Sequence, residues 1–402
     1  MSSTNTSRTL LTHATLYAPE PAGVGSVLVD GDRIAALWIE SGDRENEELP
    51  SGCRVIDLDG AALGPGWIDL HVHGADGVEL MPADGSLEGG DQEAVVGRIA
   101  RFLARHGVTG FLPATVTASM PATETAIGRV RRARQGSTGG ARVLGVHLEG
   151  PFLSVERLGA QSPDYCVPPT PAAVDRLISL VEGLPCIVTL APEVPGGLAA
   201  IRAFARTGAV VAVGHTVADT EQAEAAFAAG ATHVTHMFNG MPPMHHRRPG
   251  VVGTALLAEG VRVELIADGV HLHPTIVRLS IAVKGADGVI LVSDAMAATG
   301  CADGEYVLGP AKVSVRDGVA RLESGALAGS TLTLDRAVDN VARWTGDLGA
   351  AWQMASLTPA RQLGVADRLG RLAPGRLADL VAVDGDGRVV LTMVGGEVVY
   401  RQ

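Results

Sequence analysis

The chain has 402 residues, 46% of them hydrophobic and 19% charged, which is enough apolar material for one large domain with a small one beside it. Its net charge of −12 excludes general nucleic-acid binding, which needs a basic field, yet one local arginine can still bind a small anion. No apolar run is long enough to span a membrane, the N-terminus lacks a signal-peptide pattern, and the cysteines form no closely spaced pair. We therefore expect a cytoplasmic protein with reduced cysteines and no membrane partner.

Both ends of the chain have the composition of short strands and tight turns. Residues 1–62 contain β-rich runs such as "GSVLVDGDRIAALW", and the C-terminus reads "DLVAVDGDGRVVLTMVGGEVVYRQ", with DG and GG turns between runs. Neither segment is long enough to form a stable sheet alone. We predict that residues 1–62 and 371–402 together form one small, discontinuous β-sandwich domain.

Between these ends, strand-like and helix-like segments alternate. Helical patterns at residues 91–107, 170–183 and 219–230 each end at a glycine, the usual helix stop. The near-continuous apolar character of the strand-like runs is typical of parallel strands covered by helices. Eight such units favour a (β/α)8 barrel over residues 63–370, ahead of an open doubly wound sheet. The eight runs are "GWIDLHVH", "VTGFLPATV", "RVLGVHLEG", "CIVTLAPEV", "VVAVGHT", "THVTHMFN", "VRVELIADG" and "VILVSDAM".

One segment interrupts the alternation after the eighth run. It reads "GEYVLGPAKVSVRDGVARLESG" and predicts a β-hairpin insertion near residues 305–324.

Metal-ligand and acid–base residues close six of the eight runs. Each alone is more often a structural residue, but the strand ends of a barrel meet at one mouth, where active sites lie. Their coincidence therefore predicts a metal-dependent catalytic centre. The residues are His71, His73, Glu149, His215, His236, Asp268, His271 and Asp294.

Glu149, His215 and His236 form a His₂–carboxylate set, which is common in catalytic zinc sites and leaves a position for water. His71 and His73 lie two apart on a strand and share a face, so they either complete a second site bridged by Glu149 or hold a water. These ligand types suit zinc, which we expect, and also Fe, Co or Mn, with one or two ions per subunit.

Three further residues near these strand ends have other predicted roles. Asp294 is left as the carboxylate that takes a proton from water and later returns it. His147 shares a face with Glu149 one layer deeper, which indicates a supporting hydrogen bond. Strand alternation from His236 sends His233 to the opposite face, against the helices.

The sequence resembles the N-acetylglucosamine-6-phosphate deacetylases of the amidohydrolase superfamily over nearly its whole length. The motifs that carry the resemblance are "PGWIDLHVHG", "GVHLEGPFL", "AVGHT", "THMFNGM", "HRRPG", "IADGVHLHP", "SDAMAATG" and "LAGSTLTLDRA". The resemblance implies hydrolysis of the acetamide of N-acetylglucosamine 6-phosphate, with Glu149, His215 and His236 binding the metal and Asp294 as base and acid. His71 and His73 match a pair that provides a second metal position in some members of the family.

By the same resemblance, Asn239, Gly240 and Ala328 contact substrate, His271 contacts its phosphate or a hydroxyl, and Arg247 binds the phosphate from the neighbouring subunit of a homodimer.

The sequence departs from this family at Gln161. The family usually has a histidine there, which contacts the acetyl carbonyl, whereas this chain reads "LGAQSPDY". A glutamine amide can donate a hydrogen bond to that carbonyl but cannot become cationic. Losing such a donor to a developing oxyanion can cost about 10²–10³ in rate. Gln161 is therefore expected to bind substrate while leaving turnover and the preferred sugar open.

Two other functions remain open from the sequence. One is deacetylation of N-acetylgalactosamine 6-phosphate or of another N-acyl amino-sugar phosphate, because no residue selects the epimer. The other is a non-catalytic sugar-phosphate binding protein, against which the retention of every predicted ligand and of Asp294 argues.

Overall fold

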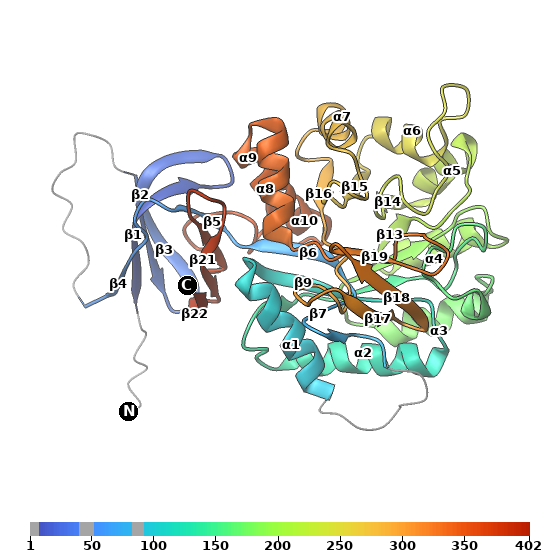
Figure 1. The fold of residues 1–402 in the computed structure, drawn as a ribbon, viewed down its shortest axis with the longest axis horizontal. Helices are drawn as coiled ribbons and strands as arrows, with labels where there is room; N and C mark the ends of the chain where they lie inside the picture. The colour runs from blue at the N-terminus through green and yellow to red at the C-terminus, as the bar shows by residue number, and fades with distance from the viewer. Residues whose placement is uncertain (1–7, 40–51, 83–91) are drawn as a thin grey trace.

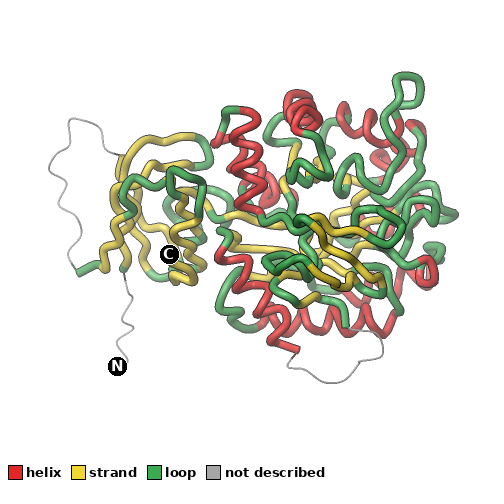
Figure 2. Tube along the Cα trace, in the orientation of Figure 1, coloured by secondary structure: helices red, strands yellow, loops and turns green. Residues whose placement is uncertain are grey.

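The computed structural model describes residues 8–39, 52–82 and 92–402. A barrel surrounded by helices forms the larger part, and a small sheet lies to one side of it (Figure 1). The strands form the inner layer and the helices surround them (Figure 2). Two predicted regions lie partly outside the described residues. They are the first residue of the helix expected at residues 91–107, Asp91, and residues 1–7 and 40–51 of the predicted small domain.

Eight parallel strands form the barrel in chain order, and the predicted fold class is confirmed. Hydrogen bonds close it between the first strand and the segment after the last: the Asp294 amide donates to the His71 carbonyl at 3.0 Å, and the His73 amide donates to the Ala295 carbonyl at 2.8 Å. The short strand β10 (Arg142–Val143) pairs with the second barrel strand just before the third begins. The barrel strands are β6 (Trp67–Val72), β9 (Val108–Thr115), β11 (Val146–Glu149), β12 (Cys186–Leu190), β13 (Val210–Val213), β14 (Ala231–Val234), β15 (Arg262–Leu265) and β16 (Val289–Leu291).

A helix follows each barrel strand and covers the outside of the sheet (Figure 1). Local sequence sets several helix ends: the Asp219 carboxylate caps α5 in a capping box, and Gly230 ends that helix in the left-handed conformation. Among the described residues, no helix is long and apolar enough to cross a membrane. The helices are α1 (Gln92–Arg105), α2 (Met120–Gln135), α3 (Pro171–Val181), α4 (Gly197–Arg206), α5 (Thr220–Ala229), α6 (Gly250–Leu257), α7 (Pro274–Lys284), α8 (Leu334–Thr345), α9 (Leu348–Ala355) and α10 (Leu357–Gln362), with a 3₁₀ turn at Pro163–Tyr165.

The small sheet joins the two ends of the chain. Its strand order is β22-β21-β20-β5-β1-β2-β3, with β4 paired to β1, so C-terminal strands lie beside N-terminal ones (Figure 1). Its separate apolar core includes Leu11, Leu63 and Leu380, and β5 leads the chain directly into the barrel. The strands are β1 (Thr9–Tyr17), β2 (Pro21–Asp30), β3 (Arg33–Ile39), β4 (Arg54–Asp57), β5 (Ala62–Pro65), β20 (Leu380–Val383), β21 (Val389–Val394) and β22 (Glu397–Arg401).

Two small antiparallel sheets lie in loops of the barrel. After β6, the two-residue strands β7 (Gly74–Ala75) and β8 (Val78–Glu79) pair with each other. Where a hairpin was expected after β16, the structure has three strands, β17 (Gly304–Leu308), β18 (Ala311–Arg316) and β19 (Val319–Arg321). The third strand forms because Asp317 and Gly318 turn the chain back onto β18.

Candidate metal centre

Three predicted ligands meet at the carboxyl end of the barrel strands. The Glu149 Oε1 atom lies 3.1 Å from His215 Nε2 and 3.0 Å from His236 Nε2, and the two imidazole nitrogens are 3.1 Å apart. All three side chains are buried. The structure thus brings together donor atoms from β11 and from the residues just after β13 and β14.

The backbone around this cluster is strained. His215, His236 and Asp294 each follow a barrel strand by two or three residues, and their φ angles of 47°, 28° and 51° lie in the left-handed region that side chains with a Cβ rarely adopt. Such strain is concentrated at functional sites, where the surrounding structure maintains it. One supporting contact comes from Glu193, whose carboxylate accepts hydrogen bonds from the Thr216 hydroxyl and, at 2.7 Å, from the Val217 amide.

The chemistry of these donors fits a divalent metal. Nδ1 of His215 lies 2.8 Å from the Arg157 carbonyl, which can only accept, so Nδ1 carries the proton and Nε2 offers its lone pair to the cluster. A second lone pair from His236 and a carboxylate oxygen face the same point. Tetrahedral zinc ligands at 2.0–2.2 Å from the ion would stand roughly 3.4 Å apart, close to the separations of these atoms.

A second group lies beside the first. His71 Nε2 and His73 Nε2 are 3.1 Å apart, and Asp294 Oδ1 lies 3.2 Å from His73 Nε2 and 3.5 Å from His71 Nε2. Glu149 faces both groups, because its Oε2 atom is 3.4 Å from His73 Nε2. The residues proposed for a second metal position are therefore arranged to share Glu149 with the first.

The ionisable side chains in the centre shift the pKa values of their neighbours. Burial raises the pKa of Glu149, but the charges of His71 and His215 and hydrogen bonds from the imidazoles outweigh it and hold that pKa well below its usual range. Burial also raises the pKa of Asp294, and the charge of His71 and a hydrogen bond from His73 reverse the effect. Burial lowers the pKa of His73, but hydrogen bonds to Asp294 and Glu149 raise it to about 9. Ionised carboxylates this deeply buried need positive charge, which protons on the imidazoles or a bound cation supply.

Glu264 is a central residue that was not predicted from the sequence. It lies inside the barrel, fully buried, and accepts from the His236 amide at 3.1 Å, while its oxygens lie 3.2 Å from His71 Nδ1 and 2.9 Å from His233 Nε2. The prediction that His233 faces the helices is wrong, since this histidine points into the barrel. The available signal was a single acidic residue in the middle of the apolar run "VRVELIADG".

His147 lies beneath the centre, where it was expected. Its Nδ1 is 3.0 Å from the Leu70 carbonyl and its Nε2 is 2.8 Å from the Thr189 hydroxyl, so both nitrogens of a neutral ring are satisfied. Burial and then the charge of His71 lower its pKa to about 3. A second buried acid that was missed, Asp69, accepts from the His71 and Ser293 amides, and burial raises its pKa to about 7.

A cavity of about 300 Å³ opens above the centre, and several predicted substrate residues line it. His271 lines the cavity with its Nδ1 held 2.7 Å from the Asp268 carboxylate, which leaves Nε2 available to a ligand. Asn239 also lines it, and its amide donates to the His236 carbonyl at 3.2 Å. A Cβ on Gly240, which has φ 62°, would lie 3.1 Å from His215 Nδ1, so only glycine allows this close approach.

Two predicted substrate residues do not line this cavity. Ala328 is buried and its amide donates to the Ala320 carbonyl, while its neighbours Leu327 and Gly329 form the wall. Arg247 is exposed on the loop before α6, where its guanidinium lies 2.7 Å from His246 Nε2. Leu308 of β17, which carries no sequence signal of a site residue, also lines the wall.

Gln161 lines the cavity but is held by protein groups. Its Oε1 accepts from the Thr117 amide at 2.6 Å, and its Nε2 donates to Glu149 Oε2. Because an amide N–H can only donate, Thr117 determines which end of the glutamine amide faces Glu149. Gln161 thus orients the carboxylate of Glu149, a predicted metal ligand, in this structure.

The chain is similar to known proteins over most of its length. Residues 62–399 match the amidohydrolase family. The chain is 39% identical over 368 residues to N-acetylglucosamine-6-phosphate deacetylase of Vibrio furnissii, covering 91% of this chain and 88% of that protein. It is 40% identical over 349 residues to N-acetylgalactosamine-6-phosphate deacetylase of Escherichia coli O157:H7, covering 87% and 90%.

Solved structures show the same architecture. N-acetylglucosamine-6-phosphate deacetylase of Pasteurella multocida superposes with a TM-score of 0.88 at 30% identity, over 97% of this chain and 99% of that one. A mutant of the Mycobacterium smegmatis enzyme in complex with N-acetyl-D-glucosamine-6-phosphate superposes with a TM-score of 0.87 at 34% identity, over 98% and 99%.

Proposed function

We propose that this chain, which belongs to the amidohydrolase family, hydrolyses the acetamide of N-acetylglucosamine 6-phosphate to glucosamine 6-phosphate and acetate. The observation that carries the proposal is the convergence of Glu149, His215 and His236 on one point, with Asp294 beside them at the floor of a sugar-sized cavity. Relatives and solved structures of this name, similar over nearly the whole chain, support it.

Glu149, His215 and His236 would hold the metal ion, for which we propose zinc, and His71 and His73 would hold a second ion if one binds. When bound, a divalent ion lowers the pKa of water and polarises the amide carbonyl. The side chains of the protein carry out the other steps, which are proton transfer and positioning of the sugar.

Asp294 is the proposed general base and acid. Its Oδ1 atom is buried and faces the centre, 3.2 Å from His73 Nε2 and 3.5 Å from His71 Nε2, where it would accept the proton of the attacking water. Its lowered pKa keeps it ionised for this step. Asp294 then returns the proton to the amine, which would otherwise be a very poor leaving group.

The remaining residues would position the sugar. His271, oriented by Asp268, presents Nε2 to a phosphate or hydroxyl, and Asn239 and Gly240 form the wall near the ligands. Ala328 would act through the loop it anchors, and Gln161 through the carboxylate it orients or through its remaining N–H. Binding of the remote phosphate would then fix the amide over Asp294.

We also propose a homodimer in which Arg247 reaches the phosphate of the neighbouring subunit. Arg247 lies outside the cavity of its own chain, on the loop between β14 and α6 that projects from the barrel (Figure 1). Next to this loop, α5, α6 and α7 border an apolar groove of about 690 Å³, with Leu257 80% exposed and Met244, Leu279 and Val283 partly exposed. An exposed apolar patch of this kind is typical of a protein interface.

Acetate release from a substrate panel, with metal analysis of the same sample, tests the function. We expect N-acetylglucosamine 6-phosphate to be hydrolysed far faster than N-acetylglucosamine, and Asp294→Asn to retain metal while losing nearly all activity. Equal efficiency on the two sugars would refute the phosphate contact, and an unchanged rate in Asp294→Asn would remove that residue from the mechanism.

N-acetylgalactosamine 6-phosphate is the second candidate substrate, because a relative named for that activity is as similar to this chain as the others. The two sugars differ at one hydroxyl, so the panel must include both epimers. A higher kcat/KM on the galacto epimer would replace the first assignment.

A further inference from the structure

A second cavity lies at the end of the barrel opposite the metal centre. It has a volume of about 380 Å³ and is formed by the end of α2 and the loop after it, β10, the turn before β12, the segment after α10 and the end of β21. Barrel strands begin at this end, whereas Glu149 and its partners stand where strands finish. The proposed deacetylation makes no use of this cavity.

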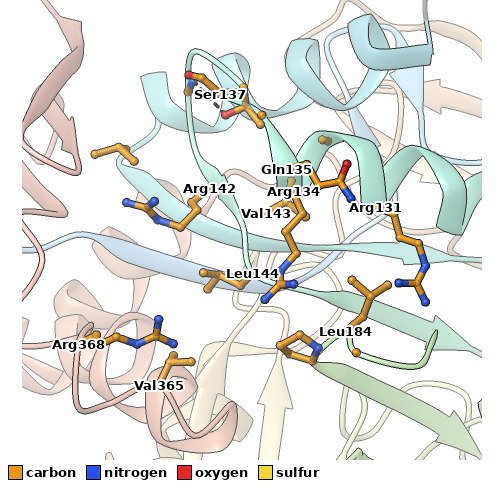
Figure 3. Close-up of a pocket in the computed structure, with 17 residues that line it drawn as sticks. Arg131, Arg134, Gln135, Ser137, Arg142, Val143, Leu144, Leu184, Val365 and Arg368 are labelled. Carbon is orange, nitrogen blue, oxygen red and sulfur yellow. Dashed lines mark hydrogen bonds between the residues drawn. The ribbon is translucent and has the colours of Figure 1, made fainter. Parts of the chain in front are cut away.

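Four arginines line the second cavity, Arg131, Arg134, Arg142 and Arg368, and its lining contains no acidic residue. This is a local concentration of positive charge in a chain whose net charge is −12. Figure 3 shows Arg134, Arg142 and Arg368 around Leu144, with Arg131 farther along the cavity. Arginine clusters of this kind recognise phosphate and carboxylate groups through charge-assisted hydrogen bonds.

The protein itself uses only part of this donor capacity. Arg131 donates to the Leu180 and Glu182 carbonyls at 2.8 Å, which satisfies the end of α3. Arg142 donates through Nη2 to Asp379 at 3.2 Å, but its Nε is buried without an acceptor in the part of the chain that the structure describes.

Two guanidinium groups are still less engaged. Arg134 makes no hydrogen bond or ion pair with any described residue, and Arg368 has only the exposed carboxylate of Asp367, at 3.7 Å. Arg134, Arg142 and Arg368 therefore retain N–H donors for a bound anion.

The floor of the cavity is apolar. Val143, Leu144, Leu184 and Val365 line it between the arginines. Val143, Leu144 and Val365 are buried and Leu184 is half-buried, so the apolar surface left for a ligand is small; an organic body would cover it, whereas an inorganic anion would contact only the guanidinium groups. We propose that the second cavity binds a phosphorylated metabolite, with its phosphate groups on Arg134, Arg142 and Arg368 and its organic part on the apolar floor.

Isothermal titration with ADP, glucosamine 6-phosphate and inorganic pyrophosphate tests this proposal. The two organic phosphates distinguish a nucleotide from a sugar phosphate, and pyrophosphate measures the contribution of charge alone. Arg134→Ala and Arg368→Ala are exposed substitutions, and each should weaken binding of the organic phosphate by roughly tenfold or more, because each removes hydrogen bonds between charged groups. Arg206→Ala removes an exposed arginine from the last turn of α4, the same kind of position, and should leave binding unchanged.

Unchanged deacetylase activity and melting temperature in these variants show that they are folded and that the metal centre is intact. Binding of ADP or glucosamine 6-phosphate that is lost in the Arg134→Ala/Arg368→Ala double variant supports the proposal. No binding of any probe at millimolar concentration, or equal affinity in the double variant, would overturn it. Pyrophosphate binding more tightly than both organic phosphates would overturn the assignment of an organic ligand.

Discussion

Glu264→Gln should weaken the metal centre from beneath. The carboxylate is fully buried and fixes the positions of three groups. These are His71 Nδ1 at 3.2 Å, His233 Nε2 at 2.9 Å and the His236 amide at 3.1 Å. Burial raises the pKa of Glu264, but the charge of His71 and the contacts with His233 outweigh this effect. The pKa of the carboxylate therefore lies well below its usual range, and the group is ionised. Glutamine keeps the shape, removes the charge and replaces one acceptor oxygen with an amide that donates.

Two quantities follow from this geometry. Loss of one member of a buried charged network costs about 3–5 kcal/mol, so the free energy of unfolding of the metal-free protein should fall by that order. Partners that orient metal-ligating histidines are worth about 10–100-fold in metal affinity, and Glu264 contacts two of the proposed ligands. We therefore expect both a lower urea midpoint and a weaker metal site.

Urea denaturation after metal removal measures the first quantity, and zinc competition against a chromogenic chelator measures the second. Asp335→Asn is the matched control, since it removes the charge of another carboxylate–histidine pair, 3.0 Å from His106 and outside the centre. Asp335→Asn should leave zinc affinity unchanged. If Glu264→Gln binds zinc as tightly as the unaltered protein does, the inference that this carboxylate orients the ligands is refuted.

Three further predictions concern His147, Gln161 and the bound metal. The pKa of His147 falls from 6.5 to about 3 in the folded protein. Between pH 6.5 and pH 3 the unfolded chain therefore binds a proton that the folded chain does not, and the free energy of unfolding falls by about 1.4 kcal/mol for each pH unit of acidification. Urea midpoints at pH 7.5 and 5.5 should therefore differ less in His147→Gln, and an identical difference would contradict the assignment. Gln161→Ala leaves the Thr117 amide and Glu149 Oε2 without their partner, so the metal-free protein should lose about 1–3 kcal/mol of stability for each unsatisfied buried group, measured by urea denaturation. A chelator should lower the melting temperature, and zinc at 100 times its Kd should restore about 2.7 kcal/mol of the free energy of unfolding. A melting temperature that changes with neither chelator nor zinc would argue against a metal in the folded protein.

The fold was predictable because its signals are local. Each barrel strand is a nearly uninterrupted apolar run, and the helical segments at residues 170–183 and 219–230 carry their own caps, seen as Thr170 and Asp219. The pairing of the two chain ends followed from the inability of either to form a sheet alone, and the sheet does contain strands from both. The third strand of the insertion was missed because its three residues, Val319–Arg321, are too few for an alternating pattern to be recognised.

The site was predictable only where strand ends coincide with metal-ligand residue types. Reading those ends placed Glu149, His215 and His236 at one mouth, and the structure brings them within hydrogen-bond distance. The position of Arg247 relative to a neighbouring cavity depends on a second chain, which no pattern within one sequence describes.

The misplacement of His233 has a specific physical cause. Strand alternation relates His233 to His236 only if the strand continues between them, but β14 ends at Val234 and His236 has φ 28°. The left-handed turn brings the His236 side chain back over the barrel, so both histidines reach Glu264, one through its ring and the other through its amide. The same conformation recurs at His215 and Asp294, so alternation fails at these three strand ends, whereas His71 and Glu149 lie within β6 and β11. Sequence periodicity therefore predicts which strands supply the chemistry, whereas the direction of a side chain that follows the end of its strand depends on backbone strain that the surrounding buried contacts impose.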